Sequence, residues 1–302
     1  MTSAKPHKTV RELILATAGY FEGKGIDSAR MEAERLLADV LGLARIELYF
    51  QFDRPVLGGE LDRYRELVRR RAAGEPLQTI LGETEFHSRV FKVAPGVFIP
   101  RPETERLVEI AVELINPPDR RLLAPVAVEI GCGTGVIGIC LALEIPRLVV
   151  EAVDIDPVAV ELTRHNAHKL GVEARVHVHQ GSRFDPLPRH LRGKVDLLVS
   201  NPPYIPSDDI AGLQTEVKDH DPLAALDGGR DGLDFYRALA HAQGQWVRPG
   251  GWIALEIGAD QGEAVTEILT ASGAVQVEVQ QDYAGRDRIV TARMPEEKDD
   301  HG

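Results

Sequence analysis

The stretch VAVEIGCGTGVIGICLAL, residues 126–143, joins a strand-like run to a helix through a glycine-rich loop. The strand reads as residues 126–130, and the turn is Glu129-Ile130-Gly131-Cys132-Gly133-Thr134-Gly135. Glycines let such a turn bend sharply and approach a ligand, while the free N–H groups of the following helix point at it. This stretch therefore predicts a ligand site just beyond the carboxyl end of a strand.

Strands and helices alternate around this stretch, from residue 103 to residue 293. Apolar runs predict strands at residues 126–130, 148–153, 175–179, 195–200, 252–257, 275–281 and 288–293. Helical patterns cover residues 103–115, 136–143, 157–170, 233–243 and 262–271. The alternation predicts an α/β fold of the Rossmann-like kind, with a mostly parallel sheet.

The N-terminal part of the chain has a different pattern. Residues 9–71 are helical, and residues 82–99 change to the shorter period of a hairpin. We expect a helical domain over residues 1–84, a hairpin linker over 85–99, an α/β domain over 100–294 and a disordered tail over 295–302. A helix at residues 61–73 carries five arginines, which we interpret as a solvated face rather than a docking surface; they are Arg63, Arg65, Arg69, Arg70 and Arg71.

Composition limits the classes of protein that this chain can be. Its 302 residues are 43% apolar and 27% charged, which excludes a disordered chain and a fibre. We find no apolar run long enough for a membrane span, no signal peptide, and only two cysteines, so a cytoplasmic protein is expected. Residues 1–95 contain 15 Lys or Arg and 14 Asp or Glu, a net charge of +1. The whole chain has a net charge of −12, so residues 96–302 carry −13. A region with this much negative charge repels a phosphate backbone, which disfavours nucleic acid as the main partner.

The glycine loop by itself allows two classes of cofactor. Gly133, Gly135 and Gly138 fit the dinucleotide fingerprint, and Asp154 ends the next strand where an acid would hold a ribose. A nicotinamide enzyme and an S-adenosylmethionine enzyme would both carry these features. Cys132 is expected to be a small filler of the turn rather than a nucleophile.

The tetrapeptide Asn201-Pro202-Pro203-Tyr204, directly after the strand at 195–200, favours the second class. The Asn201 side-chain oxygen and the Pro202 carbonyl can each accept one N–H of an amide or amino group, which would aim its nitrogen lone pair at a methyl donor. The prolines hold the loop rigid, and Tyr204 offers a flat wall. Catalysis would rest on positioning, desolvation and electrostatics, without prior proton removal. This motif indicates an N-methyltransferase but leaves its substrate open.

Over residues 9–293 the chain resembles the HemK-type protein-(glutamine N5) methyltransferases, which modify peptide chain release factors. The segments that carry the resemblance are QTILG at 78–82, VFIPRPETE at 97–105, EIGCGTG at 129–135, VSNPPYI at 199–205, LDGGRDGL at 226–233, EIG at 256–258 and GRDR at 285–288. The glycine loop and NPPY also occur in DNA and RNA amino-methyltransferases, whereas IPRPETE and DGGRDGL are much closer to specific for this family.

The resemblance implies a helical domain that grips the release factor and a seven-stranded S-adenosylmethionine-dependent methyltransferase domain. It implies methylation of the glutamine in a Gly-Gly-Gln motif, with S-adenosylhomocysteine as the second product and no direct need for nucleic acid. Asn201, Pro202 and Tyr204 would be catalytic, and Pro203 and Phe98 would join them around the glutamine. The expected cofactor residues are Glu129, Gly131, Cys132, Gly133, Thr134, Gly135, Asp154, Arg183 and Asn201.

Two further expectations concern single sites. The family has an aromatic residue near the adenine after the third strand, where this chain has Arg183 followed by Phe184. An arginine can also stack on adenine. We expect no metal, since the pairs His165/His168 and His177/His179 have no carboxylate or thiol cluster to complete a site. The alternatives are a DNA or RNA base amino-methyltransferase and a non-catalytic S-adenosylmethionine-binding translation factor.

Overall fold

The computed structural model describes residues 8–116 and 123–296. These residues form two compact units, one ending at Glu83 and the other starting at Thr84. Within the described ranges, no helix combines the length and the apolar character that crossing a bilayer requires. Of the predicted tail at 295–302, residues 297–302 lie outside the described residues.

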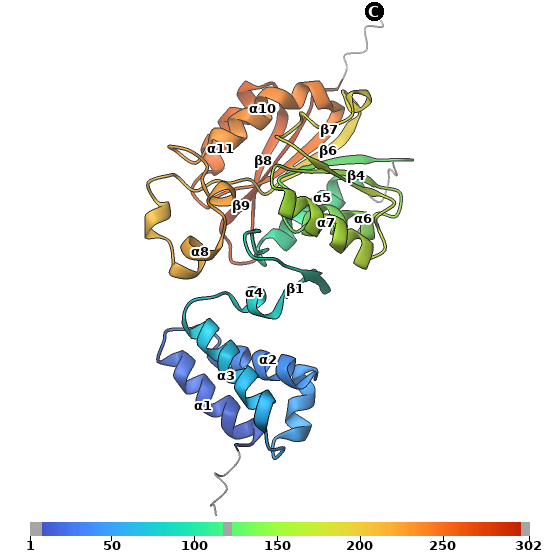
Figure 1. Ribbon diagram of the computed structural model, residues 1–302. Coiled ribbons are helices and arrows are strands. Elements are labelled where there is room, and N and C mark those ends of the chain that lie inside the picture. The colour runs from blue at the N-terminus through green and yellow to red at the C-terminus, as the bar shows by residue number, and fades with distance from the viewer. Residues whose placement is uncertain (1–7, 117–122, 297–302) are drawn as a thin grey trace, which may run out of the picture. The chain divides into compact units, whose positions relative to one another are not determined.

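The first unit is helical, as expected (Figure 1). Its apolar side chains recur at helical spacing and meet in one core around Phe21, Leu36, Leu48 and Tyr64. Its elements are α1 (Val10–Glu22), α2 (Ala29–Leu41), the 3₁₀ helix η1 (Arg45–Gln51), α3 (Gly58–Ala72) and α4 (Leu77–Leu81).

The arginines of α3 do not all lie on a solvated face. Arg71 is buried and pairs through its guanidinium with the buried Glu32 of α2, so the expectation of a solvated side chain is wrong for this residue. The two residues are 39 positions apart. The helical pattern of α3 alone could not show that Arg71 contacts a carboxylate of another helix. The remaining arginines form ion pairs with acids of the same unit, with side chains between 38% and 71% exposed.

A short hairpin follows, formed by β1 (Glu83–Phe86) and β2 (Arg89–Lys92). Its two turn residues, His87 and Ser88, both have positive φ, the backbone twist that a two-residue hairpin loop prefers. Phe86 and Phe91 are buried in the core of the second unit, where their rings meet edge to face with centroids 6.2 Å apart. The hairpin therefore packs with the α/β unit.

The second unit contains a sheet of seven strands in the order β5-β4-β3-β6-β7-β9-β8. The pairings from β5 to β7 are parallel, and β9 runs antiparallel to both β7 and β8. The expected α/β class and mostly parallel sheet are thus confirmed. The strands are β3 (Val126–Ile130), β4 (Val149–Asp154), β5 (Val176–Gln180), β6 (Val195–Ser200), β7 (Val247–Glu256), β8 (Val275–Gln281) and β9 (Asp287–Arg293).

Helices cover both faces of this sheet (Figure 1). Alternate strand residues point to opposite faces, so Ala127 and Val150 pack with α5, α6 and α7, while Val128 and Val153 pack with α10 and α11. These helices are α5 (Thr104–Ile115), α6 (Val136–Glu144), α7 (Pro157–Lys169), α10 (Asp234–Trp246) and α11 (Gly262–Ala271). Shorter helices are η2 (Arg189–Leu191), η3 (Ile210–Gly212), α8 (Thr215–His220) and α9 (Leu223–Leu226).

Candidate functional site

A cavity of about 740 Å³ lies at the carboxyl ends of β3, β4 and β6. The chain reverses its direction of winding here, because β4 and β6 lie on either side of β3, and such a point is where open α/β sheets bind ligands. Of the predicted site residues, the wall contains Phe98, Gly131, Cys132, Gly133, Thr134, Asp154, Arg183, Asn201, Pro202, Pro203 and Tyr204.

The glycine loop forms one wall of the cavity. Gly131 and Gly133 have positive φ, and the Gly131 N–H donates to the carbonyl of Val153 on β4 at 2.8 Å. Gly135 starts α6 behind this wall, where a Cβ would lie 2.7 Å from the Thr163 side chain. Close packing of loop against α7 thus requires glycine at this position.

Glu129 and Gly135 are the two predicted cofactor residues that the structure does not bring to the cavity wall. Glu129 is buried at the end of β3, and its Oε2 accepts the Gly138 N–H at 3.0 Å. Its Oε1 has no hydrogen-bond partner among the described residues. Burial raises the Glu129 pKa to about 8, more than the Gly138 hydrogen bond lowers it.

This buried acid makes a testable contribution to stability. Folding takes up a proton at Glu129, so wild-type stability falls as the pH rises from the unfolded pKa of 4.5 to the folded pKa of about 8. Glu129→Gln keeps the shape and the acceptor for Gly138 but cannot ionise. Its stability advantage over wild type is expected to grow with pH, at roughly 1.4 kcal/mol per pKa unit, to a few kcal/mol near pH 9.

Denaturant unfolding at several pH values measures this difference. The matched control is Glu161→Gln, which neutralises an exposed carboxylate on α7. Its stability difference from wild type should vary little with pH. A Glu129→Gln difference that is the same at every pH would show that Glu129 titrates as in the unfolded chain.

Asp154 stands at the end of β4 with both carboxylate oxygens oriented by the backbone. Oδ2 accepts the Gly133 N–H at 2.8 Å, and Oδ1 accepts the Asp156 N–H at 3.0 Å. Burial raises its pKa, and these backbone hydrogen bonds oppose the rise. Each oxygen keeps a lone pair, so the carboxylate can still accept a pair of hydroxyl groups.

The structure distinguishes Arg183 from Phe184. Arg183 has positive φ and lines the cavity, whereas Phe184 is buried outside it and stacks on Trp246 with ring centroids 5.6 Å apart. Arg183 is therefore the residue of this pair that a ligand in the cavity can reach.

The NPPY segment leaves β6, whose six residues are all buried, and forms the opposite wall. Within the described residues, no hydrogen bond involves the Pro202 carbonyl or the Asn201 Oδ1. The loop is held further along, where the Tyr204 carbonyl accepts from the Gln261 side chain at 2.9 Å and the Ile205 N–H donates to Leu226 at 2.9 Å. Two acceptors are thus left for a ligand on a fixed backbone.

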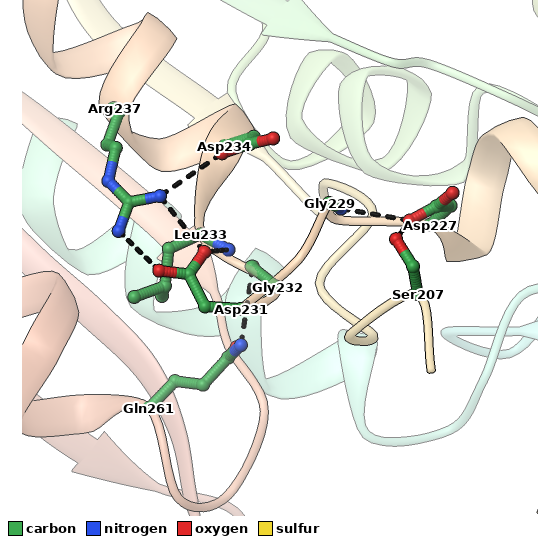
Figure 2. Close-up of polar contacts among 9 residues, drawn as sticks. All are labelled: Ser207, Asp227, Gly229, Asp231, Gly232, Leu233, Asp234, Arg237 and Gln261. Carbon is green, nitrogen blue, oxygen red and sulfur yellow. Dashed lines mark hydrogen bonds and ion pairs between the residues drawn. The ribbon is translucent and has the colours of Figure 1, made fainter. Parts of the chain in front are cut away.

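The LDGGRDGL segment, residues 226–233, is hydrogen-bonded to the chain just after NPPY, and its residues 226–229 also line the cavity. Figure 2 shows its polar contacts. Asp227 accepts from the Ser207 hydroxyl at 2.7 Å and the Gly229 N–H at 2.9 Å, and Asp231 pairs with Arg237 of α10. Gln261 reaches the Gly232 carbonyl at 3.3 Å.

Gly232 shows why this segment needs glycine. Its φ is +74°, and a Cβ at this position would lie 2.3 Å from the Tyr204 carbonyl oxygen. Any side chain would push the NPPY loop away from its place. The two segments that the sequence marks as motifs therefore form one packed structure.

Asn201 is hydrogen-bonded to a second residue of the cavity wall, Thr104, and through it to Glu256, which does not line the cavity. Asn201 Nδ2 donates to the Thr104 hydroxyl at 3.2 Å, and Thr104 donates to Glu256 Oε2 at 2.7 Å. Thr104 and Glu256 are both 2% exposed. Burial raises the Glu256 pKa to about 7, although the Thr104 hydrogen bond opposes the rise.

A third wall comes from the segment before α5. Phe98 lines the cavity, and the Arg101 guanidinium lies 5.3 Å from its ring centroid. Arg101 also donates a 2.7 Å hydrogen bond to Asp221, a buried residue that directly follows α8. Leu213 and Val217 complete the wall on this side.

Sequence reasoning missed three supporting residues. Thr104 and Glu256 lie inside motifs quoted above, where nothing indicated their hydrogen bonds, and Gln261 was not singled out. Their partners are 97, 152 and 57 residues away, respectively. A buried acid in Glu256-Ile257-Gly258 at the end of an apolar strand is the signal that could have pointed to Glu256.

The described residues contain no group of three or more His, Cys, Asp or Glu side chains arranged to hold a metal. His177 and His179 share one carboxylate: Glu151 on β4 contacts both rings, at 3.1 and 2.6 Å. Two neighbouring strands place these residues in register, which spacing along the chain could not show.

The thiol and the phenol on the cavity wall are not bases at neutral pH. Burial raises the Cys132 pKa well above its ordinary value and the Tyr204 pKa to about 12, so both groups are protonated at neutral pH. Asn201 Oδ1 and the Pro202 carbonyl are acceptors that have no partner among residues 8–116 and 123–296, and they match the two N–H bonds of an amide. A group-transfer reaction at such a nitrogen fits this arrangement.

Comparison with known proteins adds independent findings. Residues 12–82 match the family model of the PrmC N-terminal domain, and residues 103–215 match that of the methyltransferase small domain. A Geobacter sulfurreducens protein named release factor glutamine methyltransferase is 43% identical over 294 residues, 97% of this chain and 100% of that protein. A Moorella thermoacetica protein of the same name is 42% identical over 291 residues, 96% of this chain and 100% of that protein.

Among solved structures, the catalytic domain of human Mettl16, in complex with a hairpin of the MAT2A 3′ untranslated region, has the same fold. The TM-score is 0.56 at 15% identity, over 78% of this chain and 83% of that chain. At 15% identity, this similarity shows a shared fold and nothing about activity.

Proposed function

The chain belongs to the family of release factor glutamine methyltransferases, and we propose that it methylates the side-chain nitrogen N5 of the glutamine in a release factor's Gly-Gly-Gln motif, with S-adenosylmethionine as the methyl donor. The observation that carries the proposal is the pair of unused acceptors in the NPPY loop. Asn201 Oδ1 and the Pro202 carbonyl lie on a cavity whose opposite wall is a glycine loop with an oriented acid.

The residues of the cavity fit the proposed donor. Asp154 would accept the two ribose hydroxyls, since both its oxygens are already oriented. Arg183 would lie against the adenine, and the loop from Gly131 to Thr134 would surround the methionine part. When bound, this donor supplies an electrophilic methyl group on a sulfonium sulfur.

The chain's own residues would bring the nucleophile to that methyl group. Asn201 Oδ1 and the Pro202 carbonyl accept the two N–H bonds of the glutamine amide, and this fixes the direction of the nitrogen lone pair. Tyr204 and Phe98 exclude water from the planar amide. The glutamine nitrogen held in this way would take the methyl group as its bond to the sulfonium sulfur breaks, and would then release one proton to solvent. Methylated glutamine and S-adenosylhomocysteine are the products.

The two structural units would divide the work. We assign recognition of the release factor to the helical unit that ends at Glu83, and methyl transfer to the unit that starts at Thr84. The match of residues 12–82 to the PrmC N-terminal domain supports this division. The hairpin of β1 and β2 belongs with the catalytic unit, because its aromatic side chains are part of that core.

Formation of S-adenosylhomocysteine tests the proposed function against a panel of substrates. We expect turnover with an intact release factor, and loss of it with a release factor whose Gly-Gly-Gln glutamine is replaced by asparagine. The shorter asparagine side chain cannot reach both acceptors with the same geometry. Equal turnover of the two release factors, or preferred turnover of DNA or RNA, would contradict the proposal.

A further inference from the structure

Asn201 is the first member of a hydrogen-bonded chain that ends on a buried carboxylate. Its side-chain nitrogen donates to the Thr104 hydroxyl at 3.2 Å, and this hydroxyl donates to Glu256 Oε2 at 2.7 Å. The three residues come from the loop after β6, the start of α5 and the end of β7. Glu256 does not line the cavity, so its carboxylate does not contact a ligand there directly.

The number of hydrogens on each group decides which group donates in the hydrogen bonds from Asn201 to Thr104 and from Thr104 to Glu256. A threonine hydroxyl has a single hydrogen, and an ionised carboxylate can only accept. While Glu256 is ionised, Thr104 gives it that hydrogen and presents a lone pair to Asn201. The Asn201 group opposite Thr104 must then be the NH₂, which leaves Oδ1 for the cavity.

Protonation of Glu256 would remove this constraint. A carboxylic acid can donate to Thr104, whose own hydrogen is then free to turn toward Asn201. The side-chain amide of Asn201 could rotate by half a turn and present its NH₂ to the cavity. Two NH₂ groups would then face each other, and the substrate nitrogen would lose one of its two acceptors.

We propose that Glu256, acting through Thr104, is a positioning residue that decides which end of the Asn201 amide meets the substrate, so that methyl transfer requires ionised Glu256. The inference deepens the proposed function and rests on it. Because the effect acts on orientation at the reacting nitrogen, it should lower kcat more than it changes KM.

The surroundings of Glu256 make its ionisation sensitive near neutral pH. Burial raises its pKa to about 7, and the charge of Glu103, just before α5, raises it further. The Thr104 hydrogen bond, the charge of Arg288 on β9 and a direct contact with the Asn201 side chain lower it. Tyr204 and Tyr236 also face the carboxyl group, and burial raises the pKa of both, so they stay neutral. Glu256 is thus the member of this group that changes charge around pH 7.

Three variants separate this role from packing. Thr104→Val removes the hydroxyl but keeps the side-chain shape, and Thr104→Ser keeps the hydroxyl. Glu256→Gln keeps the size but removes the ionisation. With a release factor as substrate, Thr104→Val and Glu256→Gln should lower kcat about ten- to a hundredfold, and Thr104→Ser should retain most of it. KM and cofactor affinity should change by less than about threefold.

The pH profile gives a readout that a packing defect would not produce. Wild-type kcat should fall as the pH drops through about 7, because Glu256 then takes up a proton. Glu256→Gln should lack this fall. The control is Tyr236→Phe, which removes a 2.8 Å hydrogen bond to the main-chain carbonyl of Glu256 and leaves the carboxylate intact. It should keep the wild-type profile.

Nuclear magnetic resonance of the Asn201 side-chain NH₂ tests the orientation without any substrate. Its signals should shift with pH near 7 in the wild type and not in Glu256→Gln. Folded Thr104→Val and Glu256→Gln proteins with wild-type kcat and pH profile would overturn the proposal. If wild type left release factors unmethylated while the Asn201 signals still titrated with Glu256, the proposed function would fall and the orientation by Glu256 would stand.

Discussion

Asn201→Ala is expected to lower the rate of methyl transfer by at least about a hundredfold, as for the loss of a group that positions and polarises a nucleophile. The variant removes Oδ1, an acceptor on the cavity wall that has no partner within the described part of the chain. The fold should persist, because the Tyr204 carbonyl and the Ile205 N–H hold the loop independently of Asn201. Single-turnover kinetics with a release factor measure the effect on the chemical step.

Asn201→Asp tests the mechanism as well as the site. A carboxylate can still accept the substrate N–H, but it brings a negative charge and cannot donate to Thr104 as the present NH₂ does. We therefore expect a poor enzyme. An Asn201→Asp variant as fast as wild type would favour proton removal before transfer. The control is Asn116→Ala, which removes an exposed amide at the end of α5 and should leave the rate unchanged.

Asp154→Ala is expected to weaken S-adenosylmethionine binding by roughly ten- to a hundredfold, the range expected for losing hydrogen bonds to a charged group. The carboxylate also accepts the Gly133 N–H, so its removal loosens the glycine loop together with the ribose contact. Isothermal titration calorimetry measures the affinity directly.

A matched variant separates this loss from a general effect of charge. Glu161→Ala removes an exposed carboxylate from the neighbouring helix α7 and should bind the cofactor as wild type does. Unchanged affinity in Asp154→Ala would mean that the cofactor lies elsewhere in the cavity.

Much of the fold was predictable because its strands are apolar runs bounded by turn residues. β3 and β6 have the predicted ends: β6 is buried along its length and β3 from its second residue on, and each stops where a loop begins. β7 starts at Val247, five residues before the predicted Trp252, because the strand continues through Pro249, Gly250 and Gly251. These residues read as a turn, and Gly250 indeed has positive φ within the strand.

Glycines also made the start of α3 difficult to predict from the sequence. Its first residues are Gly58 and Gly59, which have low helix propensity, and the periodic pattern becomes visible only at Leu61. Helices α8 and α9 are too short to show a period at all. Packing against the rest of the unit stabilises such segments, and the local sequence does not report it.

Some residues of the candidate site could also be predicted from the sequence, and others could not. The positions of Asp154 and Asn201 could be predicted because Asp154 ends a strand and Asn201 directly follows one, at the sheet edge where ligands bind. Thr104 and Glu256 could not, because their contact joins residues 152 positions apart across the core. Glu129 has the residue type expected of a cofactor ligand, but it packs behind the glycine loop instead of on the cavity wall.

Fragmentation mass spectrometry of a release factor, after incubation with this protein and S-adenosylmethionine, tests the central claim most directly. The account predicts one added methyl group, located on the side chain of the glutamine in the Gly-Gly-Gln motif, and none when Asn201→Ala replaces the wild-type protein. A release factor without added methyl, or with the methyl group on another residue, would contradict it.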